Sequence, residues 1–392
     1  MNLLLVSIDS LRLDSVSRTN PDINTPWFDE LAKDFHFCER LFSASSATRP
    51  VHTSLFTGLY PFEHGIVGQT DSAVRTRIPH LFDLFALGGR FAGGLSEAHT
   101  IFANLPFAPW IRPFAANGVG QATELLNRRG NEGGFLFLHY WSTHTPYGAA
   151  DGQAWGETGE LLRSGQHSVV VKRYRRAVEF LFEEKLAPIL RSLDLSKWCV
   201  MIFGDHGESW TPVEPYHGVT LRNSVLRVPF YVHLPGVGAL SWPRSIISMI
   251  DIFPTVLKLF QLDADYTGFG HDIRLESKLG ERRLAQIKPV AGRDDLTGAL
   301  EPTIIGERIV GPSWALFDER RKFTHEVESA SSRLEATFEE TAIETSPEET
   351  AEYMSTFADM LDRSIYARLP MSGVTAEADD LLQERLRALG YL

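Results

Sequence analysis

Three apolar runs of the sequence end in, or lead into, side chains that can bind a cation or transfer a proton. The runs and their polar residues are 2–9 with Asp9, 134–141 with His139 and the nearby His144, and 198–207 with Asp205 and His206. Such runs are typical of strands buried on both faces, and the carboxyl ends of parallel strands meet at one edge of a sheet. Asp9 alone is equally consistent with a turn at a strand end. The adjacent Asp205 and His206, however, are costly to bury unless something positive is bound, and their oxygen and nitrogen atoms suit a divalent cation.

The segment ATRPVHTSLFTGLYP (47–61) places a hydroxyl, a cation and an imidazole in one short stretch. Pro50 suits the first turn of a helix that Gly58 would end, so Thr48 is expected at or just before a helix N-terminus. Backbone N–H groups favour an anion there. A Thr hydroxyl is a weak nucleophile that needs a base or a metal to activate it. From this segment alone, a helix cap at Thr48 and a solvated Arg49 are the simpler interpretation.

The charge of the chain limits its partners. Among 392 residues, 38 are Lys or Arg and 50 are Asp or Glu, which gives a formal net charge of −12. An acidic chain is a poor partner for nucleic acid or an anionic membrane, whereas local cations can still bind a small anionic substrate.

The composition, the cysteines and the lengths of the apolar runs indicate the cellular location. The chain is 43% hydrophobic and 22% charged, which is typical of a soluble globular protein. Cys38 and Cys199 have apolar or aromatic neighbours, so they are expected as buried thiols rather than a disulfide. The N-terminal apolar run is too short for a signal peptide, and no run approaches the roughly 18 residues of a membrane span. We therefore expect a cytoplasmic protein without membrane insertion; the oligomeric state is left open.

Strand-like and helix-like patterns alternate over most of the chain, which predicts an α/β fold with a mostly parallel central sheet between helix layers. A further apolar run lies at 228–236, and the expected helices lie at 25–35, 78–89, 168–193 and 248–262. The proline inside 248–262 is expected to start a new helix or kink this one.

The composition changes after about residue 270, where short alternating strands replace the strand–helix units. We therefore expect a catalytic domain at 1–270 and a smaller C-terminal α+β subdomain at 271–392. An acidic helical stretch at 335–363 and a terminal helix are expected within that subdomain.

The residues around Thr48 belong to a longer pattern. LFSASSATRPVHTSLFTGLYPFEHGI (41–66) resembles the signature of the sulfatase branch of the alkaline phosphatase superfamily. Other motifs resemble the same family in the same order: LLLVSIDSLRLD (3–14), FLFLHYWSTHTPY (135–147), FGDHGESW (203–210), YHGVTLRNSVLRVPFYVHLPG (216–236), SMIDIFPTVLKLFQL (248–262) and ERLRALGYL (384–392). The ordered combination is specific, although each motif alone is weak.

This resemblance implies a role for each matching residue. The implied metal ligands are Asp9, Asp205 and His206, with Thr48 as the metal-bound nucleophile. His144 and His217 would contact the transferred oxyanion or protonate the leaving group, and Arg49 is a weaker candidate for a substrate contact. His64 is interpreted as structural packing of a turn.

Three departures from the family pattern bear on the reaction. Sulfatases carry a Cys or Ser that is converted to formylglycine, and Thr48 cannot be converted in that way. His52 stands where the family often has an Arg that supports the modified residue. Asp9 is followed by Ser10 rather than a second Asp, so the site has fewer carboxylates than calcium-binding sulfatases. The set is more similar to the membrane-anchored phosphoethanolamine and glycerol-phosphate transferases, which use a Thr nucleophile on a transition metal.

The sequence therefore predicts a metal-dependent hydrolase or transferase of phosphoester bonds that forms a phospho-threonine intermediate. One divalent metal is expected, with zinc or manganese favoured over calcium or magnesium, and a second metal is left open. The alternatives are a sulfuric ester hydrolase that uses metal-activated water and a catalytically inactive sulfatase-like binding protein. The substrate is a small anionic ester, and the loops at 97–132 and 148–168 are expected to select it.

Overall fold

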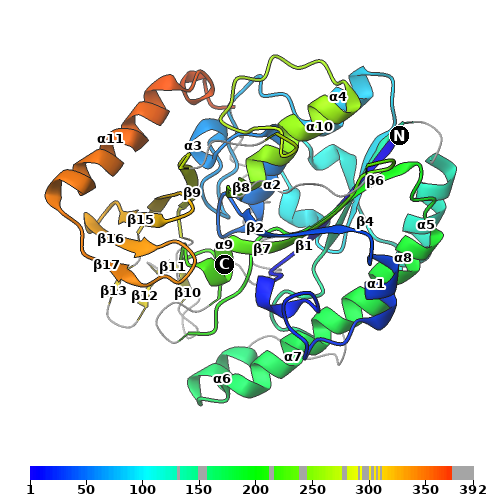
Figure 1. The fold of residues 1–392 in the computed structure, drawn as a ribbon, viewed down its shortest axis with the longest axis horizontal. Helices are drawn as coiled ribbons and strands as arrows, with labels where there is room; N and C mark the ends of the chain where they lie inside the picture. Colours follow the sequence, from blue (N-terminus) through cyan, green and yellow to red (C-terminus); the bar gives the residue numbers. More distant parts are fainter. Residues whose placement is uncertain are drawn as a thin grey trace.

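The computed structural model describes residues 1–129, 133–148, 157–211, 216–237, 245–275, 280–289, 292–293, 300–301, 304–305, 308–309 and 311–372. Its largest element is an eight-stranded sheet in the order β4-β3-β5-β1-β6-β7-β2-β8 (Figure 1). The strands are β1 (Asn2–Ile8), β2 (His36–Phe42), β3 (Ala92–Ser96), β4 (Ile111–Pro113), β5 (Phe135–Tyr140), β6 (Trp198–Gly204), β7 (Arg227–His233) and β8 (Ile247–Ser248). The expected mostly parallel sheet is confirmed, with β7 antiparallel to both β6 and β2.

Both faces of the sheet are buried because alternate residues of its central strands enter different hydrophobic clusters. In β1, Leu3 and Leu5 join one cluster, whereas Leu4 and Val6 join the other. The first cluster includes side chains of α2 (Thr48–Thr57), α4 (Leu81–Leu87) and α10 (Ile252–Phe260). The second includes those of α1 (Pro26–Leu31), α5 (Gly118–Arg129), α7 (His167–Phe180) and α8 (Ala187–Ser192). This double burial explains why the strands are continuous apolar runs.

The helices that the sequence predicted are present, with changed bounds. The long stretch at 168–193 divides into α7, a π-helical segment at Leu181–Leu186 and α8. The proline of 248–262 lies in the first turn of α10, after a 3₁₀ turn at Met249–Asp251. Shorter helices are α3 (Pro61–His64), α6 (Glu157–Arg163) and α9 (Asn223–Leu226), with 3₁₀ turns at Leu13–Ser15, His99–Phe102, Ala108–Trp110 and Tyr366–Arg368.

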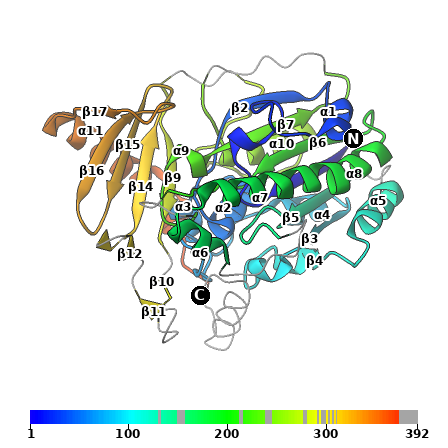
Figure 2. The ribbon, with the colours of Figure 1, turned by 90° about the horizontal axis from the view of Figure 1, so that it is seen from below.

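A second, antiparallel sheet forms the C-terminal part, beside the central sheet in Figure 2. Its strands are β9 (Arg283–Ile287), β14 (Ser313–Phe317), β15 (Arg321–Glu326), β16 (Ser331–Ala336) and β17 (Ala342–Ile343), in the order β17-β16-β15-β14-β9. The C-terminal part also contains two separate two-stranded sheets. They pair β10 (Gly292–Arg293) with β11 (Leu300–Glu301) and β12 (Ile304–Ile305) with β13 (Arg308–Ile309). The domain boundary at 270 stays a prediction.

One expectation for this part was wrong. The acidic stretch at 335–363 is helical only from Pro347, where α11 (Pro347–Arg363) begins after a Ser346 cap. Residues 335–343 contribute to β16 and β17 instead, because Leu334 and Glu335 pair with Ile343 and Ala342. Pairing between strands therefore overrides local helix propensity there. The terminal helix at 384–392 lies outside the described residues.

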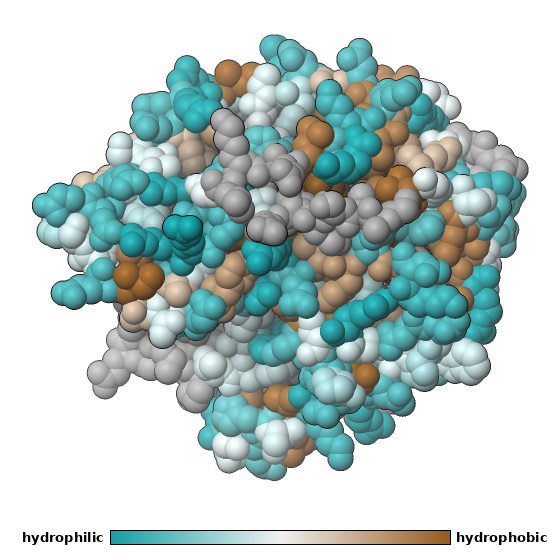
Figure 3. Space-filling model, viewed as in Figure 1, coloured by the Kyte–Doolittle hydropathy of each residue, from teal (hydrophilic) through white to brown (hydrophobic). Residues whose placement is uncertain are grey.

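The face of the molecule in Figure 3 is mainly hydrophilic, with hydrophobic residues in small groups. Cys38 and Cys199 are both buried free thiols, as expected. Within the described residues, no helix combines the length and apolar character that crossing a bilayer requires.

Candidate active site

Thr48 is held at the start of α2, next to the carboxyl ends of β1 and β6. The N-cap position is Ala47, so Thr48 is the first residue of the helix, and Gly58 ends it with a φ of 71°. A Cβ on Gly58 would lie 2.8 Å from Phe253 Cδ1, so the helix end needs glycine for space as well as conformation. The Thr48 hydroxyl donates to Asp9 Oδ2 at 3.0 Å and lies 3.3 Å from His206 Nε2. It therefore faces the acidic cluster rather than capping its own helix.

Asp9, Asp205 and His206 meet at the same edge of the sheet. One ligand atom from each lies within 4.8 Å of the others, and all three side chains are fully buried. The Asp205 backbone N–H donates to the carbonyl of Ile8, which joins the ends of β1 and β6. The turn after Asp205 is tight, because a Cβ on Gly207 would lie 2.1 Å from the Ser224 carbonyl oxygen.

The hydrogen bonds of these residues fit a cation. Asp205 Oδ1 accepts from the backbone N–H groups of Ser10 (3.2 Å) and His206 (2.6 Å), whereas Oδ2 is buried and accepts no hydrogen bond from the described residues. His206 Nδ1 donates to the carbonyl of Gly207 at 2.9 Å, so Nε2 carries the lone pair that a metal ligand needs. Two carboxylates and one imidazole are a donor set for a divalent cation.

The pKa values of Asp9 and Asp205 also fit a bound cation. Burial would raise the pKa of Asp9, but His139, His144 and His206 outweigh it and hold that pKa well below its usual range. Burial and the neighbouring Asp9 raise the pKa of Asp205 well above its usual range. Two adjacent buried carboxyl groups cannot both be charged cheaply, so the pair holds a proton unless a cation replaces it.

The histidines predicted to act on the substrate, His144 and His217, lie beside this cluster. Their ring centroids are 4.9 Å apart, and the His217 ring is 4.5 Å from that of His206. Burial lowers the pKa of His144 to about 4. Burial also acts to lower the pKa of His217, but Glu208, whose Oε1 lies 3.2 Å from His217 Nδ1, raises it overall.

Glu208 is a site residue to which the sequence assigned no role. It is fully buried, and its Oε2 accepts from the Tyr147 hydroxyl at 3.0 Å and from Thr145 at 3.3 Å. Burial would raise the pKa of Glu208, but His217 outweighs it and lowers that pKa. Its signal in the sequence was its position two residues after His206, among the potential ligands and proton carriers that follow the same apolar run.

Arg49 belongs to the framework of the site. It is fully buried, and its guanidinium donates to the carbonyls of Asp71, Ile101 and Ala103 at 2.5–3.3 Å. These bonds tie α2 to two loops and satisfy the buried guanidinium. A substrate contact by Arg49 stays a prediction. His64 likewise bonds to Ser54 Oγ at 3.0 Å and to the backbone N–H of Ile66 at 3.1 Å, as expected of a packing residue.

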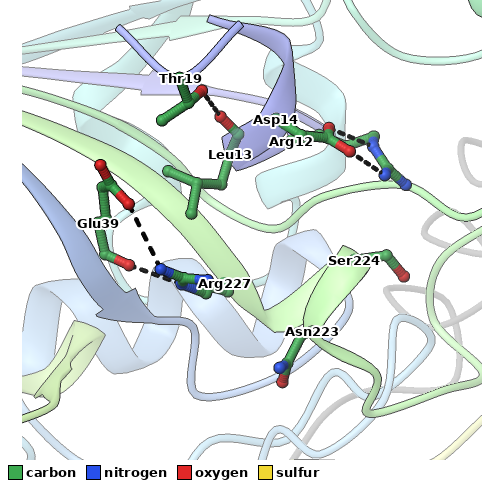
Figure 4. A pocket seen from close by; sticks show the side chains of 8 residues that line it. All are labelled: Arg12, Leu13, Asp14, Thr19, Glu39, Asn223, Ser224 and Arg227. Atoms are coloured by element: carbon green, nitrogen blue, oxygen red, sulfur yellow. Dashed lines mark hydrogen bonds and ion pairs between the residues drawn. The ribbon is translucent and has the colours of Figure 1, made fainter. Parts of the chain in front are cut away.

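A small pocket lies between the segment after β1, strand β2 and the region of α9 (Figure 4). Its volume is about 350 Å³, and Arg12, Asp14, Glu39, Asn223, Ser224 and Arg227 are among the residues that line it. Each arginine pairs with an acid, Arg12 with Asp14 and Arg227 with Glu39. The Arg12 guanidinium also donates to the carbonyl of Glu208, so Arg12 links the wall of this pocket to the segment that follows Asp205 and His206.

Comparisons with known proteins show similarity over part of the chain. A model of the type I phosphodiesterase / nucleotide pyrophosphatase family matches residues 3–83, which contain Asp9 and Thr48. Arylsulfatase K of Gallus gallus is 24% identical over 178 residues, 41% of this chain and 31% of that protein. The match thus spans about a third of the relative's length.

Solved structures share the fold over nearly the whole chain. A putative sulfatase from Bacteroides thetaiotaomicron has a TM-score of 0.71 at 15% identity and covers 96% of both chains. The lipoteichoic acid synthase LtaP from Listeria monocytogenes has a TM-score of 0.64 at 16% identity, with 95% of this chain and 93% of that chain covered. A phosphonate monoester hydrolase of Agrobacterium radiobacter has a TM-score of 0.59 at 17% identity, with 92% and 95% covered.

The chain therefore shares the α/β fold of these sulfatase, synthase and phosphonate hydrolase structures. Its residues 3–83 are similar to the type I phosphodiesterase / nucleotide pyrophosphatase family.

Proposed function

We propose that this chain is a divalent-cation-dependent hydrolase or transferase of phosphoester bonds with Thr48 as its nucleophile. The observation that carries the proposal is the position of the Thr48 hydroxyl, 3.0 Å from Asp9 Oδ2 and 3.3 Å from His206 Nε2. A hydroxyl packed against two candidate cation ligands is placed for activation, whereas a structural threonine has no need of them. Threonine at this position also favours phosphate over sulfate, because the formylglycine route requires Cys or Ser.

Asp9, Asp205 and His206 would hold the cation. When bound, a divalent cation polarises an ester oxygen and lowers the pKa of a neighbouring hydroxyl. Zinc or manganese suits a site with an imidazole ligand better than calcium or magnesium does. The proposal uses one cation.

The chain's own residues account for the other steps. Asp9 Oδ2 accepts the hydrogen bond of the Thr48 hydroxyl and directs the oxygen lone pairs away from the carboxylate. The Thr48 oxygen attacks phosphorus in line, its proton passes to Asp9 Oδ2, and the bond to the leaving oxygen breaks. His217, held by Glu208, gives a proton to that leaving oxygen, and His144 contacts the transferred group. Water, or an acceptor alcohol in a transferase, then gives a proton to His217 as it attacks phosphorus, and Thr48 leaves with the proton held by Asp9.

The test is to trap the covalent intermediate. The purified chain, loaded with zinc or manganese, is screened with phosphomonoesters, phosphodiesters, phosphonate monoesters and sulfate esters, and acid-quenched samples are analysed by mass spectrometry. We expect turnover of phosphoesters and a mass increase of one phosphoryl group on the peptide that contains Thr48. Full activity in Thr48→Ala contradicts the proposal.

Sulfate ester hydrolysis is the second candidate. The similarity to Arylsulfatase K and to sulfatase structures favours it. In that reaction, cation-activated water attacks and Thr48 serves only as a ligand. Turnover restricted to sulfate esters, without modification of Thr48, would support this alternative. A small anionic ester is the partner in either reaction, and a cytoplasmic location stays a prediction.

A further inference from the structure

A second group of ligand-type side chains lies beside the proposed cation site. His52, His139 and Asp205 place ring nitrogens and a carboxylate oxygen within 4.8 Å of one another, and all three are fully buried. This composition alone suits a second cation. The hydrogen bonds of the two rings, however, show which nitrogen of each carries the proton.

One carbonyl and one serine determine the tautomer of His52. Its Nδ1 lies 2.7 Å from the carbonyl oxygen of Thr48, which can only accept, so Nδ1 carries the proton. Its Nε2 lies 2.9 Å from Ser7 Oγ and accepts from that hydroxyl. The Nδ1 atom also lies 3.8 Å from Asp205 Oδ2, beyond hydrogen-bond distance. Both ring nitrogens of His52 are engaged, one by the Thr48 carbonyl and one by Ser7, which argues against a second cation there.

His139 has the opposite tautomer for a similar reason. Ser96 Oγ accepts from the backbone N–H of Ala98 at 3.0 Å and lies 2.8 Å from His139 Nδ1, so its hydroxyl proton is directed at that nitrogen. The ring proton then resides on Nε2, which lies 3.8 Å from Asp9 Oδ2. A carboxylate attracts an N–H and repels a lone pair, so both ends of the ring favour the same tautomer.

The sheet places these groups side by side. In the registers of β5 with β1 and β3, His139 is opposite both Ser7 and Ser96. His52 comes one helical turn after Thr48 in α2, and Ser7 reaches across to it. The two serines are thus set by strand pairing, and each selects the tautomer of one ring.

We propose that His139 is a positioning residue of the cation site, which turns its Nε2–H toward the ligand carboxylate of Asp9, 3.8 Å away. His52, whose N–H is given to the Thr48 carbonyl, holds the start of α2 beside Asp205. The inference rests on the proposed function, because it requires Asp9 and Asp205 to hold a cation. Groups behind metal ligands typically change metal affinity by about 10- to 100-fold.

The test measures the affinity for Zn²⁺ alone, by competition with a chromophoric chelator and without substrate. The variants are His139→Leu, which removes the N–H, and His139→Gln, which restores one on an amide. His64→Leu is the matched control, since His64 is also fully buried and bonded to a serine, but its ring nitrogens bond to Ser54 and Ile66.

We expect His139→Leu to bind Zn²⁺ about 10- to 100-fold more weakly than the wild type, His139→Gln to recover most of that loss, and folded His64→Leu to match the wild type. Equal affinity in His139→Leu and the wild type overturns this inference alone, and so does an equal loss in His64→Leu. A wild-type chain that binds neither Zn²⁺ nor Mn²⁺ overturns the proposed function as well.

A second pair of variants, each with a smaller change, tests the inference if His139→Leu does not fold. Ser96→Ala removes the hydroxyl that fixes the tautomer of His139. Ser54→Ala removes the corresponding hydroxyl next to His64. With Co²⁺ in the site, we expect the visible absorption bands to shift in Ser96→Ala and to stay unchanged in Ser54→Ala. Identical Co²⁺ spectra for Ser96→Ala and the wild type overturn the inference.

Discussion

The hydroxyl of Thr48 lies 3.0 Å from Oδ2 of Asp9, although 39 residues separate them in the sequence. The carboxylate ends a buried strand, and the hydroxyl begins a helix packed on one face of the same sheet. Neither residue has a reason to be polar and fully buried in isolation. Together with Asp205 and His206 they form one site.

Removal of the Thr48 hydroxyl should abolish turnover without unfolding the chain. Loss of a nucleophile lowers kcat by about 10³-fold or more. We expect that loss in Thr48→Ala, whereas Thr48→Ser, which keeps the hydroxyl, retains measurable turnover. Steady-state kinetics with the best ester of the screen, together with far-ultraviolet circular dichroism, checks this. A Thr48→Ala variant that turns over normally would show that Thr48 is structural.

Asp205→Asn should separate the stability of the chain from its response to a cation. Without a cation the raised pKa of Asp205 keeps a proton on the carboxyl pair, and the Asn oxygen can still accept from Ser10 and His206, so the cation-free chain should keep its stability. A cation at 100 times its Kd stabilises the wild type by about 2.7 kcal/mol, and the variant should lose this gain. Thermal unfolding with and without Zn²⁺ measures both effects, and an unchanged Zn²⁺ response would contradict the assigned ligands.

Arg49→Lys should affect stability and leave substrate binding intact. Lysine cannot reach the carbonyls of Asp71, Ile101 and Ala103 together, and buried carbonyls left without a donor cost about 2–4 kcal/mol in total. We expect a lower Tm and an unchanged KM for the folded enzyme. A raised KM at unchanged Tm would instead assign Arg49 to the substrate.

Glu208→Gln should shift the pH profile through His217. His217 must be protonated to act as an acid, so activity falls as the pH rises through its pKa. Glu208 raises that pKa, and its neutral replacement should move the alkaline limb of kcat/KM to lower pH. Tyr147→Phe is the control, because it removes a donor to Glu208 but keeps the charge. If the alkaline limb of kcat/KM does not move in Glu208→Gln, Glu208 does not control the pKa of the group that acts as the acid.

Glu63 should make the stability of the fold depend on pH away from the site. Burial raises its pKa to about 7 from an ordinary value of 4.5. Its contribution is therefore fully present below about pH 4.5 and is lost as the pH rises through about 7, by about 3 kcal/mol in total. Glu63→Gln mimics the protonated form and should flatten this part of the profile. Free energies of unfolding between pH 4.5 and 8 measure it, and parallel profiles for the two proteins would refute the role of Glu63.

The sequence was most informative where burial is continuous. The apolar runs at 2–9, 134–141 and 198–207 predicted β1, β5 and β6, because a strand covered on both faces must be apolar throughout. It was least informative for β3, whose Gly-Gly pair weakens the strand pattern, and for the start of α11, where strand pairing overrides local preference.

The sequence by itself determined the kinds of side chain available to the site and their order along the chain, since strand ends and a helix start are local patterns. Only the tertiary structure decided which of them meet. It turned the Thr48 hydroxyl toward Asp9, committed Arg49 to backbone carbonyls, and set His52 and His139 behind the carboxylates with Ser7 and Ser96 beside them. Those relationships depend on strand register and helix packing between segments far apart in the chain, which no local pattern encodes.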